Sequence, residues 1–347
     1  MPHPETVPVA NSVGPRVVAW EITRRCPLSC RHCRGGAADR AYENELTADE
    51  CLRVLDSLAG FTRPMIIWTG GEPMYRPDIL QLVAAATERG LRSVMAPCGT
   101  LVTSDSLQRL KDVGVMACSF SLDGATEEEH DAFRGVAGAY RNVTRAMSVA
   151  RDLGMPFQVN CTVSKLNADR LPAIRELAIS LGAKTLDLFF LVPVGRGRGI
   201  ADLAVDPATA ERLLRWAFAI DQAGPIRVRE TCAPQAVRIW EGMGLTGQPP
   251  SGCMGGRGFT FISHTGILQP CGFLDIPCAD LRASDYNFKR AYLESPVFRD
   301  LRQPDRYGGH CGRCGFRTRC GGCRARAYAA TGDYMAAEPG CVLNGNG

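Results

Sequence analysis

The chain has 347 residues, of which 45% are apolar, and a formal net charge of +4 at pH 7. This apolar content can bury one large core or two smaller ones, which excludes a disordered chain and a small disulfide-stapled peptide. Acidic and basic residues are interleaved, so we expect no nucleic-acid partner. No apolar run approaches the roughly 20 residues that cross a bilayer, so we expect no membrane partner.

The first sixteen residues lack the basic and apolar segments of a secretory signal. We therefore expect residues 1–16 to be a flexible leader and the protein to be cytoplasmic. The chain contains 16 cysteines. In a reducing compartment, cysteines clustered as they are here indicate metal binding rather than disulfides.

Residues 17–230 alternate short apolar runs with amphipathic stretches, the pattern of strands followed by helices. Thr47 and Glu50 form a capping box that predicts the start of the first helix, and Gly90 and Gly114 lie where later helices are expected to end. Further helices are expected near residues 167–181 and 207–223. About six such units predict an α/β fold, an open or partial barrel of parallel strands, with ligand sites at the carboxyl ends of the strands.

After residue 230 the chain becomes rich in glycine and proline, and eight cysteines lie between Cys253 and the end. Helical periodicity fades in this part of the sequence. We therefore expect residues 231–347 to form a small, loop-rich domain that is held together by metal rather than by an apolar core.

The segment CPLSCRHC places Cys26, Cys30 and Cys33 directly after the first predicted strand, among four arginines. Guanidinium groups are poor neighbours for packed thiols and good ones for thiolates. A structural zinc site needs four ligands, and His32 is poorly placed to be the fourth because it adjoins Cys33. A 4Fe-4S cluster bound by three cysteines keeps one iron open, so iron–sulfur chemistry fits better than zinc or packing.

This C-x3-C-x2-C spacing after the first strand resembles the radical SAM (S-adenosylmethionine) enzymes. In that family the open iron chelates the amine and carboxylate of SAM, and reductive cleavage gives a 5′-deoxyadenosyl radical. The resemblance extends over about residues 17–341. It implies a partial (β/α)6 barrel, a SAM-bound 4Fe-4S cluster, and a flavodoxin- or ferredoxin-type reductant as partner.

Other motifs match the family's SAM-binding pattern: TGGEP, SFSLDG and HDAFRG. TGGEP and HDAFRG also have plainer interpretations, a glycine turn and a solvated helix residue. The resemblance implies that SAM is bound by Gly70, Gly71 and Glu72 at its ammonium group, by Ser121 and Asp123 at the ribose, by Arg134 at the carboxylate, and by Leu191 at the adenine. For Leu191, core packing is the alternative.

The cysteine-rich tail resembles the SPASM or twitch extension, which holds one or two auxiliary 4Fe-4S clusters. The resemblance implies an outer cluster on Cys311, Cys314, Cys320 and Cys341, and an inner cluster on Cys253, Cys271 and Cys323. The inner set lacks a fourth ligand, so either Cys232 completes it or one iron stays open. Zinc bound by the CxxC pairs is the alternative. The remaining cysteines are expected to pack in the core: Cys51, Cys98, Cys118, Cys161 and Cys278.

Three functions compete: a decarboxylase of a small molecule, a peptide maturase, and a zinc protein without catalysis. A maturase is disfavoured because barely sixteen residues precede the first strand, which leaves no room for a leader-binding domain. Gly272 also stands where sulfatase maturases have aspartate. A separate leader-binding partner would revive the maturase hypothesis.

The finer resemblance, in segments such as WTGGEPMYRPDI and GFTFISHTGILQPCGF, is to the haem-pathway branch. That branch includes Fe-coproporphyrin decarboxylases, which convert propionates into vinyl groups, and the cytosylglucuronate decarboxylase of nucleoside antibiotic biosynthesis. Both act on small-molecule carboxylates, and Arg196, Arg198 or Arg257 is a candidate to bind the carboxylate. The alanine and arginine richness suggests a GC-rich genome with specialised metabolism, so cytosylglucuronate is the favoured substrate and Fe-coproporphyrin III the alternative.

Overall fold

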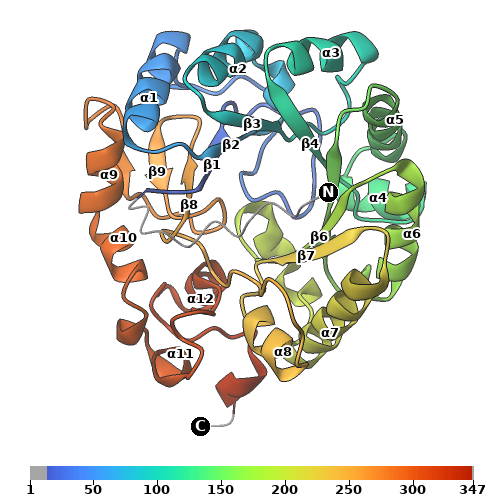
Figure 1. Ribbon diagram of the computed structural model, residues 1–347, viewed down its shortest axis with the longest axis vertical. Coiled ribbons are helices and arrows are strands. Elements are labelled where there is room, and N and C mark those ends of the chain that lie inside the picture. Colours follow the sequence, from blue (N-terminus) through green and yellow to red (C-terminus); the bar gives the residue numbers. More distant parts are fainter. Residues whose placement is uncertain (1–13, 346–347) are drawn as a thin grey trace.

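The structure is a computed structural model that describes residues 14–345 (Figure 1). Its strands form one sheet in the order β10-β9-β8-β1-β2-β3-β4-β5-β6-β7, and β1 to β7 are all parallel. The strands are β1 (Val17–Glu21), β2 (Met65–Thr69), β3 (Arg92–Met95), β4 (Val115–Ser121), β5 (Phe157–Val163), β6 (Thr185–Phe190), β7 (Arg227–Thr231), β8 (Phe259–Ile262), β9 (Ile267–Gln269) and β10 (Ala279–Asp280).

Helices surround the curved sheet on its outer side (Figure 1). They are α1 (Ala48–Phe61), α2 (Ile79–Glu88), α3 (Ser104–Asp112), α4 (Glu127–Arg134), α5 (Ala139–Asp152), α6 (Leu171–Leu181), α7 (Pro207–Ala223), α8 (Ala236–Gly242), α9 (Phe288–Glu294), α10 (Pro296–Leu301), α11 (Gly309–Arg313) and α12 (Arg324–Thr331). The predicted α/β fold with parallel strands is confirmed. Within residues 14–345, no helix has the length and apolar character needed to cross a membrane.

Local signals in the sequence set several helix ends. Both hydrogen bonds of the predicted capping box at Thr47 and Glu50 are present at the start of α1. Gly90 and Gly114 adopt φ values of 70° and 107°, which favour glycine, just after α2 and α3. Helix α7 begins and ends where the sequence predicts. The leader predicted for residues 1–16 lies mostly outside the described residues.

The main core lies between the sheet and helices α1 to α3 and α5 to α10, so the first part of the tail shares it. Trp20 on β1 and Trp68 on β2 are fully buried and stack with ring centroids 5.6 Å apart. Parallel strands with both faces covered are rich in branched and aromatic residues, as these strands are. This core supports the carboxyl ends of the strands, where the candidate site lies.

The tail differs from the loop-rich domain that we expected. Strand β8 pairs in parallel with β1, and the antiparallel strands β9 and β10 extend the same sheet. Five short helices, α8 to α12, also lie in this part of the chain. The sequence did not predict these elements because helices of five to eight residues are too short to show a clear hydrophobic period.

Candidate active site and cysteine clusters

The predicted cysteine motif forms a loop between β1 and α1. Cys26 and Cys30 are buried, Cys33 is half-buried, and all three pack in one small cluster with Leu28 and Ala37. Cys26 lies five residues beyond the end of β1, at the edge where parallel strands place ligand sites. The structure therefore brings the three predicted thiols together.

The GGE motif supports this loop through its backbone. The amides of Gly71 and Glu72 donate to the carbonyls of Thr23 and Arg25, at 2.8 and 2.7 Å. A Cβ on Gly70 would lie 2.3 Å from the Thr23 carbonyl oxygen, and one on Gly71 would lie 2.2 Å from that of Arg25. Both glycines are therefore required for the close approach of two backbone segments, whatever they bind.

Arg196, a predicted carboxylate-binding candidate, also supports the loop. Its Nε donates to the Cys30 carbonyl at 2.9 Å and its Nη1 to the Ala37 carbonyl at 2.6 Å. Two of the three guanidinium nitrogens thus position the cysteine loop. Of the other two candidates, Arg198 is exposed and Arg257 donates to the Thr318 carbonyl in the tail.

The loop thiols have polar partners suited to thiolates. The Leu28 amide donates to the Cys26 sulfur at 3.5 Å, the Ala37 amide to Cys33 at 3.4 Å, and Arg134 to Cys30 at 3.7 Å. Burial nevertheless raises the pKa of Cys26 to about 12 and also raises the pKa of Cys30. Cys26 and Cys30 are therefore protonated without metal, and iron binding has to release their protons.

The predicted SAM-binding residues lie around this loop, and their roles remain predictions. The buried Glu72 carboxylate accepts the amides of Met74 and Cys98, at 2.9 and 2.6 Å, and burial raises its pKa. Ser121 ends β4 and is half-buried. Leu191 packs with Phe133 and Ile200, as the alternative of core packing predicts.

Asp123 and Arg134, predicted to bind the ribose and the carboxylate of SAM, form a buried ion pair at 2.5 Å. Asp123 also accepts the Thr162 amide at 2.7 Å, and it lines a cavity of about 220 Å³ together with Phe133 and Asn167. Burial alone would raise the pKa of Asp123, but the positive charge of Arg134 overcomes this and lowers it. Arg134 thus links Asp123 to the Cys30 thiol.

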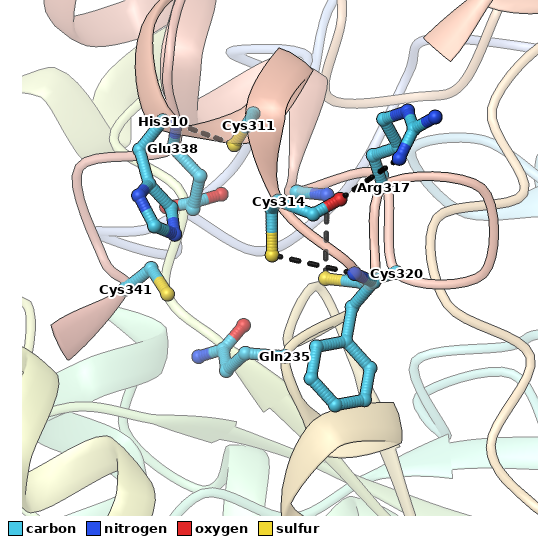
Figure 2. Close-up of a pocket in the computed structure, with 11 residues that line it drawn as sticks. Gln235, His310, Cys311, Cys314, Arg317, Cys320, Glu338 and Cys341 are labelled. Carbon is cyan, nitrogen blue, oxygen red and sulfur yellow. Dashed lines mark hydrogen bonds between the residues drawn. The ribbon is translucent and has the colours of Figure 1, made fainter. Parts of the chain in front are cut away.

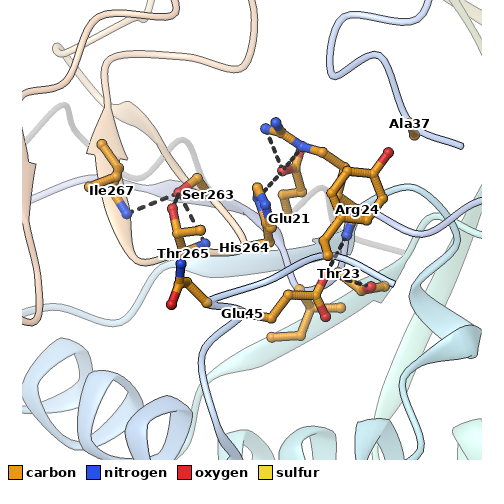
Figure 3. Close-up of polar contacts among 12 residues, drawn as sticks. Glu21, Thr23, Arg24, Ala37, Glu45, Ser263, His264, Thr265 and Ile267 are labelled. Carbon is orange, nitrogen blue, oxygen red and sulfur yellow. Dashed lines mark hydrogen bonds and ion pairs between the residues drawn. The ribbon is translucent and has the colours of Figure 1, made fainter. Parts of the chain in front are cut away.

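The sequence analysis missed a polar cluster at the end of β1 (Figure 3). Glu21 is 1% exposed, and its carboxylate contacts Arg24 at 2.9 Å, Arg34 at 3.1 Å and His264 Nδ1 at 2.7 Å. Burial alone would raise the pKa of Glu21, but the contact with His264 and the charges of Arg34 and Arg24 lower it to about 2. The signal available in the sequence was a glutamate at the carboxyl end of an apolar strand.

The four predicted outer-cluster cysteines border one cavity in the tail: Cys311, Cys314, Cys320 and Cys341 (Figure 2). Three of these sulfurs accept backbone amides, from Glu338 to Cys311 at 3.3 Å, Phe316 to Cys314 at 3.4 Å and Gly322 to Cys320 at 3.5 Å. The buried Arg324 also donates to Cys311, at 3.5 Å. Amide and guanidinium donors aimed at sulfur stabilise bound thiolates and tune iron–sulfur clusters.

The predicted inner-cluster cysteines also lie together. Cys271 and Cys323 share one small apolar cluster. Cys253 lies near Cys271, since Cys253 Sγ and Cys271 Cβ are each 3.8 Å from the position that a Cβ on Gly255 would occupy. The Leu274 amide donates to the Cys271 sulfur at 3.3 Å. Burial raises the pKa of Cys271 to about 12. The described residues thus bring together both predicted sets.

The cysteines expected to pack behave differently. The thiols of Cys51 and Cys278 donate to the carbonyls of Leu46 and Ile276 rather than accept amides. Within residues 14–345, no group of three or more Cys, His, Asp or Glu side chains has the spacing to hold a single metal ion. The outer four cysteines instead surround a cavity, an arrangement that suits a multi-iron cluster better than one tetrahedral zinc.

Comparison with known proteins agrees with this geometry. The profile of the radical SAM superfamily matches residues 20–178. An AdoMet-dependent heme synthase from Nitratidesulfovibrio vulgaris is 41% identical over 338 residues, covering 94% of this chain and 92% of the relative. The Fe-coproporphyrin III synthase of Methanosarcina barkeri is 29% identical over 354 residues, covering 94% and 88%.

Solved structures share the fold. SuiB from Streptococcus suis, bound to its precursor peptide SuiA, aligns with a TM-score of 0.76 over 95% of this chain and 76% of that chain. The identity is 17%, so this likeness concerns the fold alone.

Proposed function

Since this chain belongs to the radical SAM superfamily and to its haem-pathway-like branch, we propose that it removes carboxylates from the propionate side chains of Fe-coproporphyrin III. Its cofactors are SAM and 4Fe-4S clusters, which together supply a 5′-deoxyadenosyl radical that abstracts hydrogen. The relatives favour this porphyrin substrate over cytosylglucuronate, so our preference for the sugar acid and for antibiotic biosynthesis is corrected. We further propose a cytoplasmic location and a flavodoxin- or ferredoxin-type reductant.

The cationic cluster around Glu21 is the observation that supports a carboxylate substrate. Two guanidinium groups and an imidazole contact one buried carboxylate, so the positive charge in direct contact with Glu21 exceeds the negative charge of that carboxylate. Arg24 and Arg34 are partly exposed, at 31% and 19% of their side-chain surface. A guanidinium group can bind a further carboxylate through paired hydrogen bonds, and an excess of positive charge attracts an anionic substrate.

Arg34 lies between the two ends of the proposed active site. It adjoins Cys33 in the chain, and its Nε lies 3.0 Å from the position that a Cβ on Gly272 would occupy, next to Cys271. Its guanidinium also stacks over the Phe261 ring, 4.1 Å from the centroid. A propionate held by Arg34 would therefore lie between the SAM-cluster loop and the inner-cluster cysteines.

The proposed reaction balances as follows. The propionate loses one hydrogen atom from the carbon next to the ring and one electron, and its bond to the carboxylate carbon breaks. The products are a vinyl group and carbon dioxide. The hydrogen atom goes to the 5′-deoxyadenosyl radical, and the electron would pass to an oxidised auxiliary 4Fe-4S cluster.

The test is an anaerobic assay in which the iron-loaded protein is reduced and incubated with SAM and either Fe-coproporphyrin III or cytosylglucuronate. Loss of carbon dioxide and two hydrogens from the porphyrin, read by mass, is the expected result. Loss of carbon dioxide from the nucleoside would overturn the porphyrin proposal. Release of 5′-deoxyadenosine without either product would favour a peptide substrate.

A pair of variants tests the proposed role of Arg34. Arg34→Gln is expected to raise the KM for the porphyrin about 10-fold or more, since one charged hydrogen bond is worth roughly 1.5–3 kcal/mol. Arg92→Gln removes the same charge from an exposed position at the amino end of β3 and is expected to leave the KM unchanged. Equal effects of the two variants would contradict the assignment of the carboxylate to Arg34.

A further inference from the structure

Cys232 lies beside the inner-cluster cysteines although it is far from them in the sequence. Cys232, Cys271 and Cys323 pack in the same small cluster with Leu274. Cys253 joins them through its proximity to Cys271, across Gly255. Four thiols therefore converge where the predicted ligand set had three.

The backbone at Cys232 is held in an unusual conformation. Cys232 follows the last residue of β7 and has a φ of 61°, in the left-handed region that residues with a Cβ avoid. Such a conformation is strained and persists only where its surroundings impose it. Here the Arg326 side chain on α12 donates to the Cys232 carbonyl at 2.9 Å. The strained turn and this hydrogen bond place the thiol beside Cys323, which directly precedes α12.

The surroundings of these thiols supply positive charge and amide donors. Arg326 is 13% exposed in its side chain and pairs with the buried Glu338 at 3.1 Å. Glu338 in turn accepts the Cys323 amide at 2.6 Å. A buried cation next to thiols favours their deprotonated, metal-binding form. An inert packing cysteine would need neither this charge nor the strained backbone.

We propose that Cys232 is the fourth ligand of the inner auxiliary cluster, together with Cys253, Cys271 and Cys323. The proposal deepens the proposed function, since it rests on the presence of an iron–sulfur cluster at this site. A cluster with four thiolate ligands has no open iron. Substrate then binds beside the inner cluster rather than to it, and the site is suited to electron transfer.

The test uses the full chain with Cys26, Cys30 and Cys33 all replaced by alanine, so that only auxiliary iron contributes to the spectra. In this background we compare Cys232→Ala with Cys161→Ala, which removes a buried thiol far from the tail cluster. The readouts are the iron content, the Mössbauer spectrum, and the EPR spectrum of the reduced protein with and without added cyanide.

With Cys232 present, the EPR spectrum is expected to be insensitive to cyanide. Cys232→Ala is expected either to lose about four irons per chain or to keep a cluster whose EPR spectrum shifts on addition of cyanide, which binds the newly open iron. Cys161→Ala is expected to match the background in every readout. If Cys232→Ala keeps all its iron, an unchanged spectrum and no cyanide response, the proposal is overturned.

Two further results distinguish a failure of this proposal from a failure of the proposed function. Absence of iron from the tail even with Cys232 present would show that the inner cluster itself does not exist. Cys232→Ser keeps a potential oxygen ligand and guards against a folding defect in the alanine variant. We expect it to retain iron with an altered reduction potential, whereas an unaltered potential would count against ligation by Cys232.

Discussion

The two cysteine-bearing regions are supported in different ways. The barrel holds the loop with Cys26, Cys30 and Cys33 through hydrogen bonds. The backbone amides of the GGE motif and the side chain of Arg196 donate these bonds to carbonyls of the loop segment. The outer cysteines of the tail instead depend on polar contacts made by Arg324 and Glu338, next to a small apolar cluster. A region with little apolar core draws its stability from bound metal. Residues 231–301 contribute to the main core, whereas residues 305–345 do not. The barrel is therefore expected to fold without iron, and residues 305–345 to require it.

Removal of iron should give the largest effect. Chelation under reducing conditions is expected to abolish the protection of tail amides, residues 305–345, against hydrogen exchange. Binding of a structural metal is worth on the order of 10 kcal/mol, which the small tail core cannot replace. Hydrogen exchange followed by mass spectrometry, peptide by peptide, measures the difference. Amides of β1 to β6 serve as the internal control and should keep their protection.

Substitution of Gly71 should give the next largest effect. A Cβ at this position would overlap the Arg25 carbonyl, so Gly71→Ala is expected to displace the cysteine loop and cost about 4 kcal/mol in unfolding free energy. The variant should lose the SAM-cluster iron and keep the tail iron. Gly60→Ala in α1 meets no atom within 4 Å and should leave the iron content unchanged. Full iron content in the Gly71 variant would show that the loop tolerates the shift.

Glu21 predicts a pH dependence on the barrel side. Its pKa is lowered to about 2 in the folded state, so its charged form stabilises the protein above about pH 4.5, and this stabilisation is lost as the pH falls towards 2. Glu21→Gln should cost about 3 kcal/mol at pH 7, and the difference from wild type should vanish near pH 2. Urea unfolding of both proteins between pH 2 and pH 7 measures this. If the difference in unfolding free energy between the two proteins stays constant over that range, charged Glu21 is not stabilised by its contacts with Arg24, Arg34 and His264.

The smallest effect concerns a site remote from iron. Thr47→Ala removes the side-chain oxygen that accepts the Glu50 amide at the start of α1, and loss of such a cap costs about 1 kcal/mol. The unfolding midpoint of the barrel should fall while the iron content and the tail exchange stay unchanged. A change in tail exchange would mean that barrel and tail unfold as one unit.

Much of the fold could be predicted because its signals are local. Apolar runs, the capping box at Thr47 and the glycines after α2 and α3 act within a few residues, so they are visible in one segment at a time. The cysteine groups were also visible, because metal ligands recur at short spacings. The short tail helices and the pairing of β8 with β1 depend on contacts between distant segments, and these leave no periodic signal.

The site's polar partners escaped prediction for the same reason. Glu21 and His264 are more than two hundred residues apart and meet only because β1 and β8 are neighbours in the sheet. Arg196 was expected to bind substrate, yet it binds backbone carbonyls of the cysteine loop. The sequence identified Arg196 as a positive charge. Its role could not be predicted, because it depends on how the segment after β6 lies against the cysteine loop.

The most direct test of this account is the iron content of the anaerobically reconstituted protein compared with that of the variant in which Cys26, Cys30 and Cys33 are all alanine. We predict about twelve irons per chain in the first and about eight in the second, four for each cubane cluster. The variant should also release no 5′-deoxyadenosine from SAM. About four irons in the wild-type protein, with zinc in the tail, would contradict the account, as would SAM cleavage by the variant.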